Sequence, residues 1–177
     1  AFKNCIGLDS ISIPEKVTSL GSRCFQNCNG LETIKTYNPT PSSTINSFEG
    51  VNTNTCKLFI PYNSFGPYST ANGWKDFLSI EEMPGFILSD TLLYLSVSGE
   101  TEDTIFIQSN TTWNISIDQP WLSTIKSSGT GNDTIFFTAE TNSTFESRIA
   151  YATVTANGVE PQRIKVIQDP TLNLTIS

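Results

Sequence analysis

The chain has 177 residues, a net charge of −7 and 15% charged residues. An average globular protein carries about 25% charged residues. The negative charge argues against nucleic acid and anionic membranes as partners, because both attract basic surfaces. No apolar run reaches the roughly 18 residues of a membrane-spanning helix, so we expect no membrane insertion by this chain.

Histidine is absent from the sequence. This residue is the commonest general base and metal ligand in proteins. Since the sequence also has no metal-ligand set and no nucleophile motif, we expect no catalytic residues, no metal and no cofactor. The acidic group Glu100, Glu102 and Asp103 is typical of a solvated turn. Calcium binding is the less favoured alternative, because these residues have no recognised calcium-loop spacing.

The first 34 residues contain the same pattern twice, with a period of about 23 residues. The matched pairs are Phe2 and Phe25, Cys5 and Cys28, Leu8 and Leu31, and Ile11 and Ile34. A period of roughly 20–29 residues is typical of leucine-rich repeats, whose turns stack into a solenoid. Because the chain opens inside a turn, we expect a piece of a longer array, with further repeats and a signal peptide outside it.

A third, altered turn follows the first two. Phe48 comes 23 residues after Phe25, and Leu58-x-Ile60-Pro61 repeats the pattern Ile11-x-Ile13-Pro14. Alternating isoleucines followed by proline are typical of a short strand that ends at the proline. The repeats therefore predict a series of short strands.

The repeats end in a segment with helical periodicity. Large residues occur there at three- and four-residue steps, as on one face of a short helix: Tyr68, Ala71, Trp74, Phe77 and Leu78. We interpret this helix as a cap over the end of the solenoid. Asn72-Gly73 is an awkward pair inside a helix, so a helix that begins or restarts at this pair is the alternative to a continuous one. Trp74 is then a buried cap residue, with an exposed ligand platform as the alternative.

The four cysteines are Cys5, Cys24, Cys28 and Cys56. Their repeat spacing favours small buried apolar residues. A Cys24–Cys28 or a Cys5–Cys28 disulfide is the alternative.

Pro84-Gly85 marks a domain boundary at about 83–86, because this dipeptide is a turn signal and the periodicity changes after it. We predict domains at 1–83 and 86–169, with a tail at 170–177. Seven short alternating runs fill the second domain and predict a seven-stranded, Ig-like antiparallel β-sandwich. The runs lie at 93–97, 105–107, 113–117, 121–122, 135–139, 150–154 and 164–166. The fold class is therefore mostly β, with a solenoid fragment first.

Two family resemblances cover most of the chain. The pattern A-F-x-x-C-x-x-L-x-x-I-x-I-P-x-x-V-x-x-L-G resembles the BspA-type leucine-rich repeats of bacterial surface proteins, over roughly the first 80 residues. The second half resembles the BACON domain of Bacteroidetes proteins, which is named for a proposed link to carbohydrate. The matching residues are Ser109-Asn110, Trp113-x-Ile115-Ser116-x-Asp118, Trp121-Leu122, the turn at 128–131, Thr141-Asn142, Arg148, Ala150, Ala152, Val154 and Val166-x-Gln168. These resemblances imply a secreted or cell-surface, outer-membrane-associated protein.

Aromatic residues are the candidate ligand contacts. Trp113 shares the inward register of Ile115, so we predict that it lies in the core. Trp121 is also favoured as a core residue, with sugar stacking as the alternative. The further glycan-binding candidates are Tyr151 in the second half and Tyr62 and Tyr68 in the first, on the expectation that they are exposed. We expect Arg148 and Gln168 to make structural contacts.

The leading functional hypothesis is a non-catalytic, monomeric adhesion protein that recognises a host protein or a glycan, such as mucin or a polysaccharide. The first alternative makes the sandwich a spacer that presents the repeats. The second makes it an accessory module of a larger carbohydrate-active enzyme.

Overall fold

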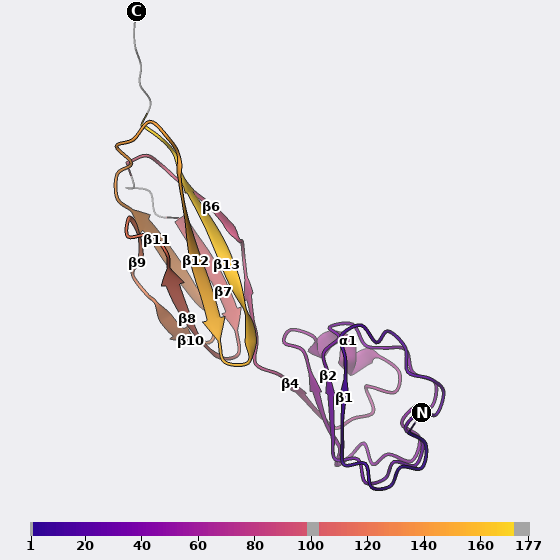
Figure 1. The fold of residues 1–177 in the computed structure, drawn as a ribbon. Helices are drawn as coiled ribbons and strands as arrows, with labels where there is room; N and C mark the ends of the chain where they lie inside the picture. Colours follow the sequence, from indigo (N-terminus) through magenta and orange to yellow (C-terminus); the bar gives the residue numbers. More distant parts are fainter. Residues whose placement is uncertain (1, 99–102, 172–177) are drawn as a thin grey trace, which may run out of the picture. The chain divides into compact units, whose positions relative to one another are not determined.

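The computed structural model describes residues 2–98 and 103–171 (Figure 1). The chain divides into two compact units, Ala1–Met83 and Pro84–Ser177, and each unit has its own hydrophobic core. Glu100, Glu102 and most of the predicted tail lie outside the described residues. Asp103 is the first residue of a strand.

The first unit is a solenoid built on one parallel sheet. Its strands are β1 (Ser10–Ile13), β2 (Thr33–Thr36), β3 (Lys57–Ile60) and β4 (Ser79–Glu82), in the order β1-β2-β3-β4. Ile11 pairs with Ile34, and Ile34 pairs with Leu58. The predicted repeat register is thereby confirmed, because matched positions of successive turns lie side by side. β4 is a fourth strand that the sequence did not indicate.

A phenylalanine ladder runs through the core of this unit. The rings of Phe2, Phe25 and Phe48 stack in parallel, with centroids 5.5 and 5.8 Å apart. Trp74 meets Phe48 edge-on at 5.0 Å, and Phe77 does so at 5.2 Å. Trp74 is fully buried, and its Nε1 donates to the Ser42 carbonyl at 2.7 Å. The interpretation of Trp74 as a buried cap residue is confirmed.

The same corner recurs in every turn of the solenoid. Asn4, Asn27, Gly50 and Gly73 are spaced by 23 residues and all have positive φ, at 62°, 60°, 80° and 80°. Glycine and asparagine adopt this left-handed conformation most readily, which explains why these residue types occupy the corner. The Asn27 Nδ2 also donates to the Asn4 Oδ1 at 3.0 Å, so the corner residues of the first two turns are linked.

The capping helix is shorter than the periodicity predicted. α1 spans Phe65–Thr70, and Ala71 after it is already extended. Trp74 and Phe77 reach the core from the turns that follow, and Leu78 is 77% exposed, so the prediction of one continuous helical face was wrong. A right-handed helix cannot run on through this segment, because the backbone is extended at Ala71 and left-handed at Gly73, where φ is +80°.

All four cysteines are free thiols. Cys24, Cys28 and Cys56 are buried, which confirms the interpretation as small core residues for these three, and neither alternative disulfide forms. Cys28 Sγ donates to the Phe2 carbonyl at 2.9 Å. The same interpretation was wrong for Cys5, which is exposed because it belongs to the turn of β1, at the edge of the sheet.

The second unit consists of two sheets that share one core cluster. The five-stranded sheet has the order β10-β8-β12-β13-β6, and the four-stranded sheet has the order β5-β7-β11-β9. The strands are β5 (Phe86–Leu88), β6 (Leu92–Leu95), β7 (Asp103–Ser109), β8 (Thr112–Ile117), β9 (Leu122–Thr124), β10 (Ser128–Thr130), β11 (Asp133–Ala139), β12 (Arg148–Ala156) and β13 (Val159–Gln168).

Two details of the predicted sandwich were wrong. The unit has nine strands among its described residues, because β5 and β10 add to the seven predicted runs. Each of these strands has only three residues, too few to show an alternating pattern. β6 pairs with β13 in parallel, so the five-stranded sheet is mixed instead of antiparallel. Alternation reveals which face a side chain occupies, but it does not reveal strand direction.

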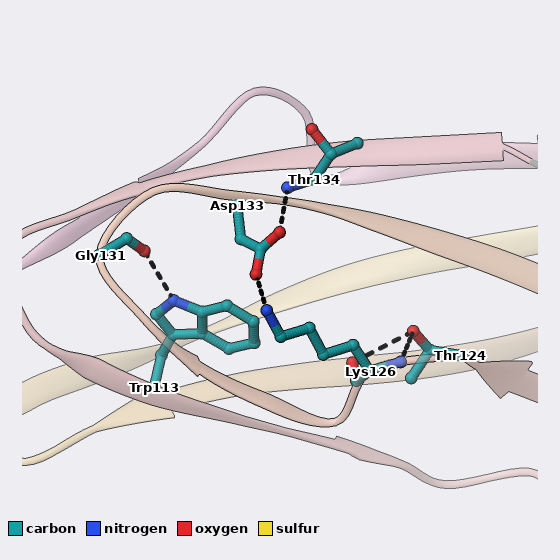
Figure 2. Close-up of polar contacts among 6 residues, drawn as sticks. All are labelled: Trp113, Thr124, Lys126, Gly131, Asp133 and Thr134. Atoms are coloured by element: carbon teal, nitrogen blue, oxygen red, sulfur yellow. Dashed lines mark hydrogen bonds and ion pairs between the residues drawn. The ribbon is translucent and has the colours of Figure 1, made fainter.

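Trp113 anchors one end of the five-stranded sheet (Figure 2). The side chain is fully buried, which confirms the prediction for Trp113, and its Nε1 donates to the Gly131 carbonyl at 2.9 Å. Beside it, Lys126 Nζ forms an ion pair with Asp133 Oδ2. This hydrogen bond from Lys126 is the main reason why the pKa of the Asp133 carboxyl is lowered from its ordinary value.

Candidate binding surfaces

Tyr68 lies inside the first unit and is fully buried. Its hydroxyl donates to the Asn38 carbonyl at 2.8 Å and lies 3.1 Å from the Thr36 hydroxyl. Burial raises the pKa of the Tyr68 hydroxyl. The expectation that Tyr68 is exposed was therefore wrong, because the single buried face of α1 is the face that carries it.

Trp121 is also unavailable as a stacking platform. It is only 8% exposed, and the Arg148 guanidinium lies over its ring, 4.4 Å from the guanidinium carbon to the ring centroid. The prediction that Trp121 belongs to the core is confirmed.

Arg148 and Gln168 link the start of β12 and the end of β13 to the residues that follow β6 and β11. Arg148 Nε donates to Gln168 Oε1 at 2.7 Å, and its Nη2 donates to the Glu140 carbonyl at 2.5 Å. The fully buried Gln168 donates through Nε2 to the carbonyls of Ser96 and Glu140, at 3.0 and 2.9 Å. Both side chains make the structural contacts that the sequence predicted.

Tyr62 and Tyr151 remain partly exposed. Tyr62 lies between β3 and α1 in the first unit. Tyr151 lies on β12, where its backbone N–H donates to Asp118 Oδ1 at 2.7 Å. The Arg163 guanidinium carbon lies 4.0 Å from the centroid of the Tyr151 ring.

Tyr151 belongs to a continuous surface on the outer side of the five-stranded sheet. We name this surface the tyrosine face. In one row across three strands, Ile149 pairs with Ile167, and Ile167 pairs with Tyr94. In the next row, Tyr151 pairs with Lys165, and Lys165 pairs with Leu92. The members of the tyrosine face are Leu92, Tyr94, Ile149, Tyr151, Arg163, Lys165 and Ile167.

Several members of the tyrosine face are well exposed, with 63% for Tyr94 and 45% for Ile149. Sequence reasoning missed Tyr94, although its position between the inward Leu93 and Leu95 indicates an outward side chain. The tyrosine was overlooked because its neighbours across the sheet depend on the parallel pairing of β6 with β13.

The outer side of the solenoid sheet forms a second surface, which we name the repeat face. One row runs through Ser12, Lys35, Phe59 and Glu81, and the other through Ser10, Thr33, Lys57 and Ser79. Lys35 Nζ lies 5.8 Å from the centroid of the Phe59 ring, and Lys57 Nζ lies 3.6 Å from Glu81 Oε1. A hollow of about 370 Å³ lies over β1 and β2.

The four-stranded sheet of the second unit exposes a third surface, the phenylalanine face. Its apolar members, Ile87, Phe106 and Phe136, are 40–44% exposed. The outward residues beside them are uncharged, and include Thr104, Gln108 and Thr134. This surface lies on the opposite sheet from the tyrosine face, so the two can be altered independently.

The first unit also has a hollow of about 530 Å³, whose lining includes Glu49, Ile45 and Asp76. The Glu49 carboxylate is already engaged, because it accepts a hydrogen bond from Gln26 Nε2 at 2.6 Å and lies 3.5 Å from Arg23 Nε. Among the residues that the structure describes, no group of three or more acidic, cysteine or histidine side chains is arranged to hold a metal ion. Within the same residues, no helix has the length and apolar character needed to cross a membrane.

Each of the two units matches a different known family. Residues 1–75 match the family described as BspA type Leucine rich repeat region, and residues 89–170 match the family described as Viral BACON domain. The chain carries BspA-type leucine-rich repeats followed by a BACON domain. Both predicted resemblances are confirmed, in the predicted order. Leucine-rich repeats of this type and BACON domains are typical of surface or secreted proteins.

No curated protein matches the chain. Among solved structures, a Bacteroides ovatus GH5 xyloglucanase in complex with a XXXG heptasaccharide is 27% identical, over 49% of this chain and 19% of its own, with a TM-score of 0.47. The Pseudomonas aeruginosa CupB2 chaperone is 15% identical, over 50% of this chain and 57% of its own, with a TM-score of 0.41. The chain thus covers less than two thirds of the length of each of these two solved structures. With TM-scores this low, neither likeness bears on the ligand of the BACON domain.

Proposed function

We propose that the protein is a non-catalytic binding protein, secreted or held at the cell surface, that adheres to a host protein or a glycan. The observation that carries this proposal is the tyrosine face of the BACON domain. Two tyrosines and three aliphatic residues meet there in adjacent rows of one sheet. Contiguous exposed apolar side chains mark interaction surfaces, and tyrosine supplies contact area at a low cost in conformational entropy.

A glycan fits this surface because ring side chains can pack against the apolar faces of sugars while their hydroxyl groups form hydrogen bonds. The repeat face supports the wider role in adhesion. Its two rows of side chains repeat with the solenoid, and extended solenoid surfaces suit macromolecular partners.

A binding role without catalysis is proposed for a chemical reason. The sequence has no histidine, and the members of the tyrosine face are tyrosine, lysine, arginine and aliphatic residues, with no acidic group to pair with a base. Trp121 and Arg148, which could otherwise contact a ligand, are already bound to each other.

Binding of the intact chain to immobilised mucin, to a panel of polysaccharides and to extracellular-matrix proteins tests the proposal. We expect saturable binding that is lost in a Tyr94→Ala, Tyr151→Ala double variant whose melting temperature is unchanged. A Lys35→Ala, Phe59→Ala double variant is the matched change on the repeat face.

Each result distinguishes the remaining alternatives. Loss of binding only in the repeat-face variant would make the BACON domain a spacer that presents the repeats. A catalytic domain in the full reading frame would favour an accessory module of a larger enzyme. If the intact chain binds no glycan and no protein, the proposal fails.

A further inference from the structure

Positive charge is scarce in the BACON unit and is concentrated at one place. Residues 84–177 contain four lysines and arginines against ten acidic residues, so this part of the chain has a net charge of −6. Two of the four cations are engaged within the fold: Lys126 pairs with Asp133, and Arg148 is held by Trp121 and Gln168. The other two, Arg163 and Lys165, both belong to the tyrosine face.

Arg163 and Lys165 are available to an anionic ligand. They lie two residues apart on β13, which separates their Cα atoms by about 7 Å on the same side of the sheet. Arg163 stacks on Tyr151, and its only ion-pair contact among the described residues is with Asp118 at 4.0 Å, where both side chains are substantially exposed. Lys165 forms no ion pair with any described residue.

Apolar and aromatic side chains surround these two cations. In the strand register, Lys165 has Tyr151 on one side and Leu92 on the other, and the row beside it contains Tyr94 and Ile149. A ligand that contacts both charges must therefore also cover aromatic and aliphatic surface. An inorganic anion offers no such surface, whereas a chain of sugar rings with attached acidic groups does.

We infer that the tyrosine face binds an acidic polysaccharide, one whose sugar rings carry carboxylate or sulfate groups. This inference rests on the proposed function and names its ligand class. The rings pack against Tyr94 and Tyr151, and the acidic groups accept hydrogen bonds from Lys165 and Arg163. The rest of the unit is acidic and repels such a polymer, so the two cations determine which face it contacts.

An acidic peptide is less well matched to this surface. Peptides that bind sheets add a strand at an edge through backbone hydrogen bonds. Lys165 and Arg163 lie on β13, which already has β12 on one side and β6 on the other. The tyrosine face thus presents a broad area of side chains instead of free backbone groups at the position of its charges.

The experiment measures binding of the intact chain to polygalacturonate and to its fully methyl-esterified form, which has the same sugar backbone without the charges. Sulfated dextran and plain dextran form the second matched pair, and polyglutamate represents an acidic peptide. The variants are Lys165→Gln and Arg163→Gln. Lys75→Gln changes the net charge equally at an exposed position of the other unit.

We expect a charged polymer to bind more tightly than its neutral partner, and added salt to weaken the binding. Lys165→Gln and Arg163→Gln should each weaken it about fivefold or more, and Lys75→Gln should leave it unchanged. The pair that shows the larger difference identifies carboxylate or sulfate as the preferred group.

Three results would overturn the inference in distinguishable ways. Equal binding of charged and neutral polymers would remove the acidic class and leave the proposed binding function intact. Equal binding of polyglutamate and polygalacturonate would assign the face to acidic peptides. If no polysaccharide and no protein binds the intact chain, the inference and the proposed function fail together.

Discussion

Gly129 lies directly against the indole ring of Trp113. A Cβ atom at position 129 would overlap Cζ2 of the buried indole, and the ring cannot move away because its Nε1 is bonded to the Gly131 carbonyl. Glycine in β10 is therefore required by close packing, and the short strand can cover the tryptophan only without a side chain at this position.

Gly129→Ala should destabilise the BACON domain by about 1–3 kcal/mol, because an added methyl group overpacks the core. Chemical denaturation followed by tryptophan fluorescence measures this loss. Gly158→Ala is the control in the same domain: it has open space around it and only a positive φ of 73°, which costs about 1–2 kcal/mol. A smaller loss in Gly129→Ala than in Gly158→Ala would contradict the packing argument.

Gln168→Leu should cost about 2–3 kcal/mol of stability, since it removes the hydrogen bonds that the fully buried Gln168 side chain donates to the Ser96 and Glu140 carbonyls and the one that it accepts from Arg148 Nε. Gln162→Leu on the same strand is the matched control, because the Gln162 side chain donates to one carbonyl among the described residues, that of Phe86 at 3.2 Å, and is less buried. Urea unfolding of both variants gives the comparison. Equal losses would show that the network around Gln168 adds nothing to an ordinary hydrogen bond.

The repeat made the solenoid predictable, because a fixed period determines which residues of successive turns lie side by side. Ile11, Ile34 and Leu58 were aligned correctly on this basis. The helix in the cap was too long in the prediction, since its periodicity continued past Gly73 although the backbone there is left-handed. In this segment the backbone conformation determines where the helix ends, although the spacing of the large side chains alone predicts a longer helix.

The candidate surface was only partly predictable. Tyr151 was identified as an outward aromatic residue, but its partners Tyr94 and Lys165 come from strands whose order and direction no alternation reveals. Tyr68 was misjudged for a related reason: a one-turn helix has too few residues to show which side is buried. A surface that several strands share can be predicted only when the order and direction of the strands are known. A buried position such as Trp113 can be predicted from the alternation within its own strand.

The phenylalanine ladder predicts a gradient of stability along the solenoid. Phe48→Ala should cost about 3–5 kcal/mol, because this buried ring contacts Phe25, Trp74 and Phe77. Phe2→Ala should cost much less, since Phe2 is 43% exposed and stacks on Phe25 alone. Thermal unfolding of the two variants tests the difference. Similar losses of stability would show that the burial of Phe48 and its contacts with Trp74 and Phe77 add nothing to ring stacking alone.

Asp133 should contribute stability that depends on pH. Its pKa is lowered in the folded state, mainly by the hydrogen bond from Lys126, so the contribution is complete above the ordinary Asp pKa of about 3.9. It is lost as the pH falls through the lowered folded value, because the protonated carboxyl no longer holds Lys126 as an ion pair. Unfolding midpoints between pH 2 and 7 should therefore decline less steeply at the acid end in Asp133→Asn than in the native chain. Lys126→Gln should reduce the slope by the same amount, and an unchanged slope in either variant would contradict the assignment.

The thiols should differ sharply in reactivity. Cys5 is exposed, whereas Cys24, Cys28 and Cys56 are buried. Burial raises the pKa of the Cys56 thiol to about 11 and also raises that of Cys24, which lowers the concentration of the reactive thiolate near neutral pH. The folded chain should react rapidly with Ellman's reagent at one site, which Cys5→Ser removes, and the denatured chain should react at all four. Rapid reaction at any site in the folded Cys5→Ser variant would mean that the solenoid core opens locally. Fewer than four reactive sites in the unsubstituted chain, denatured without reductant, would reveal a disulfide.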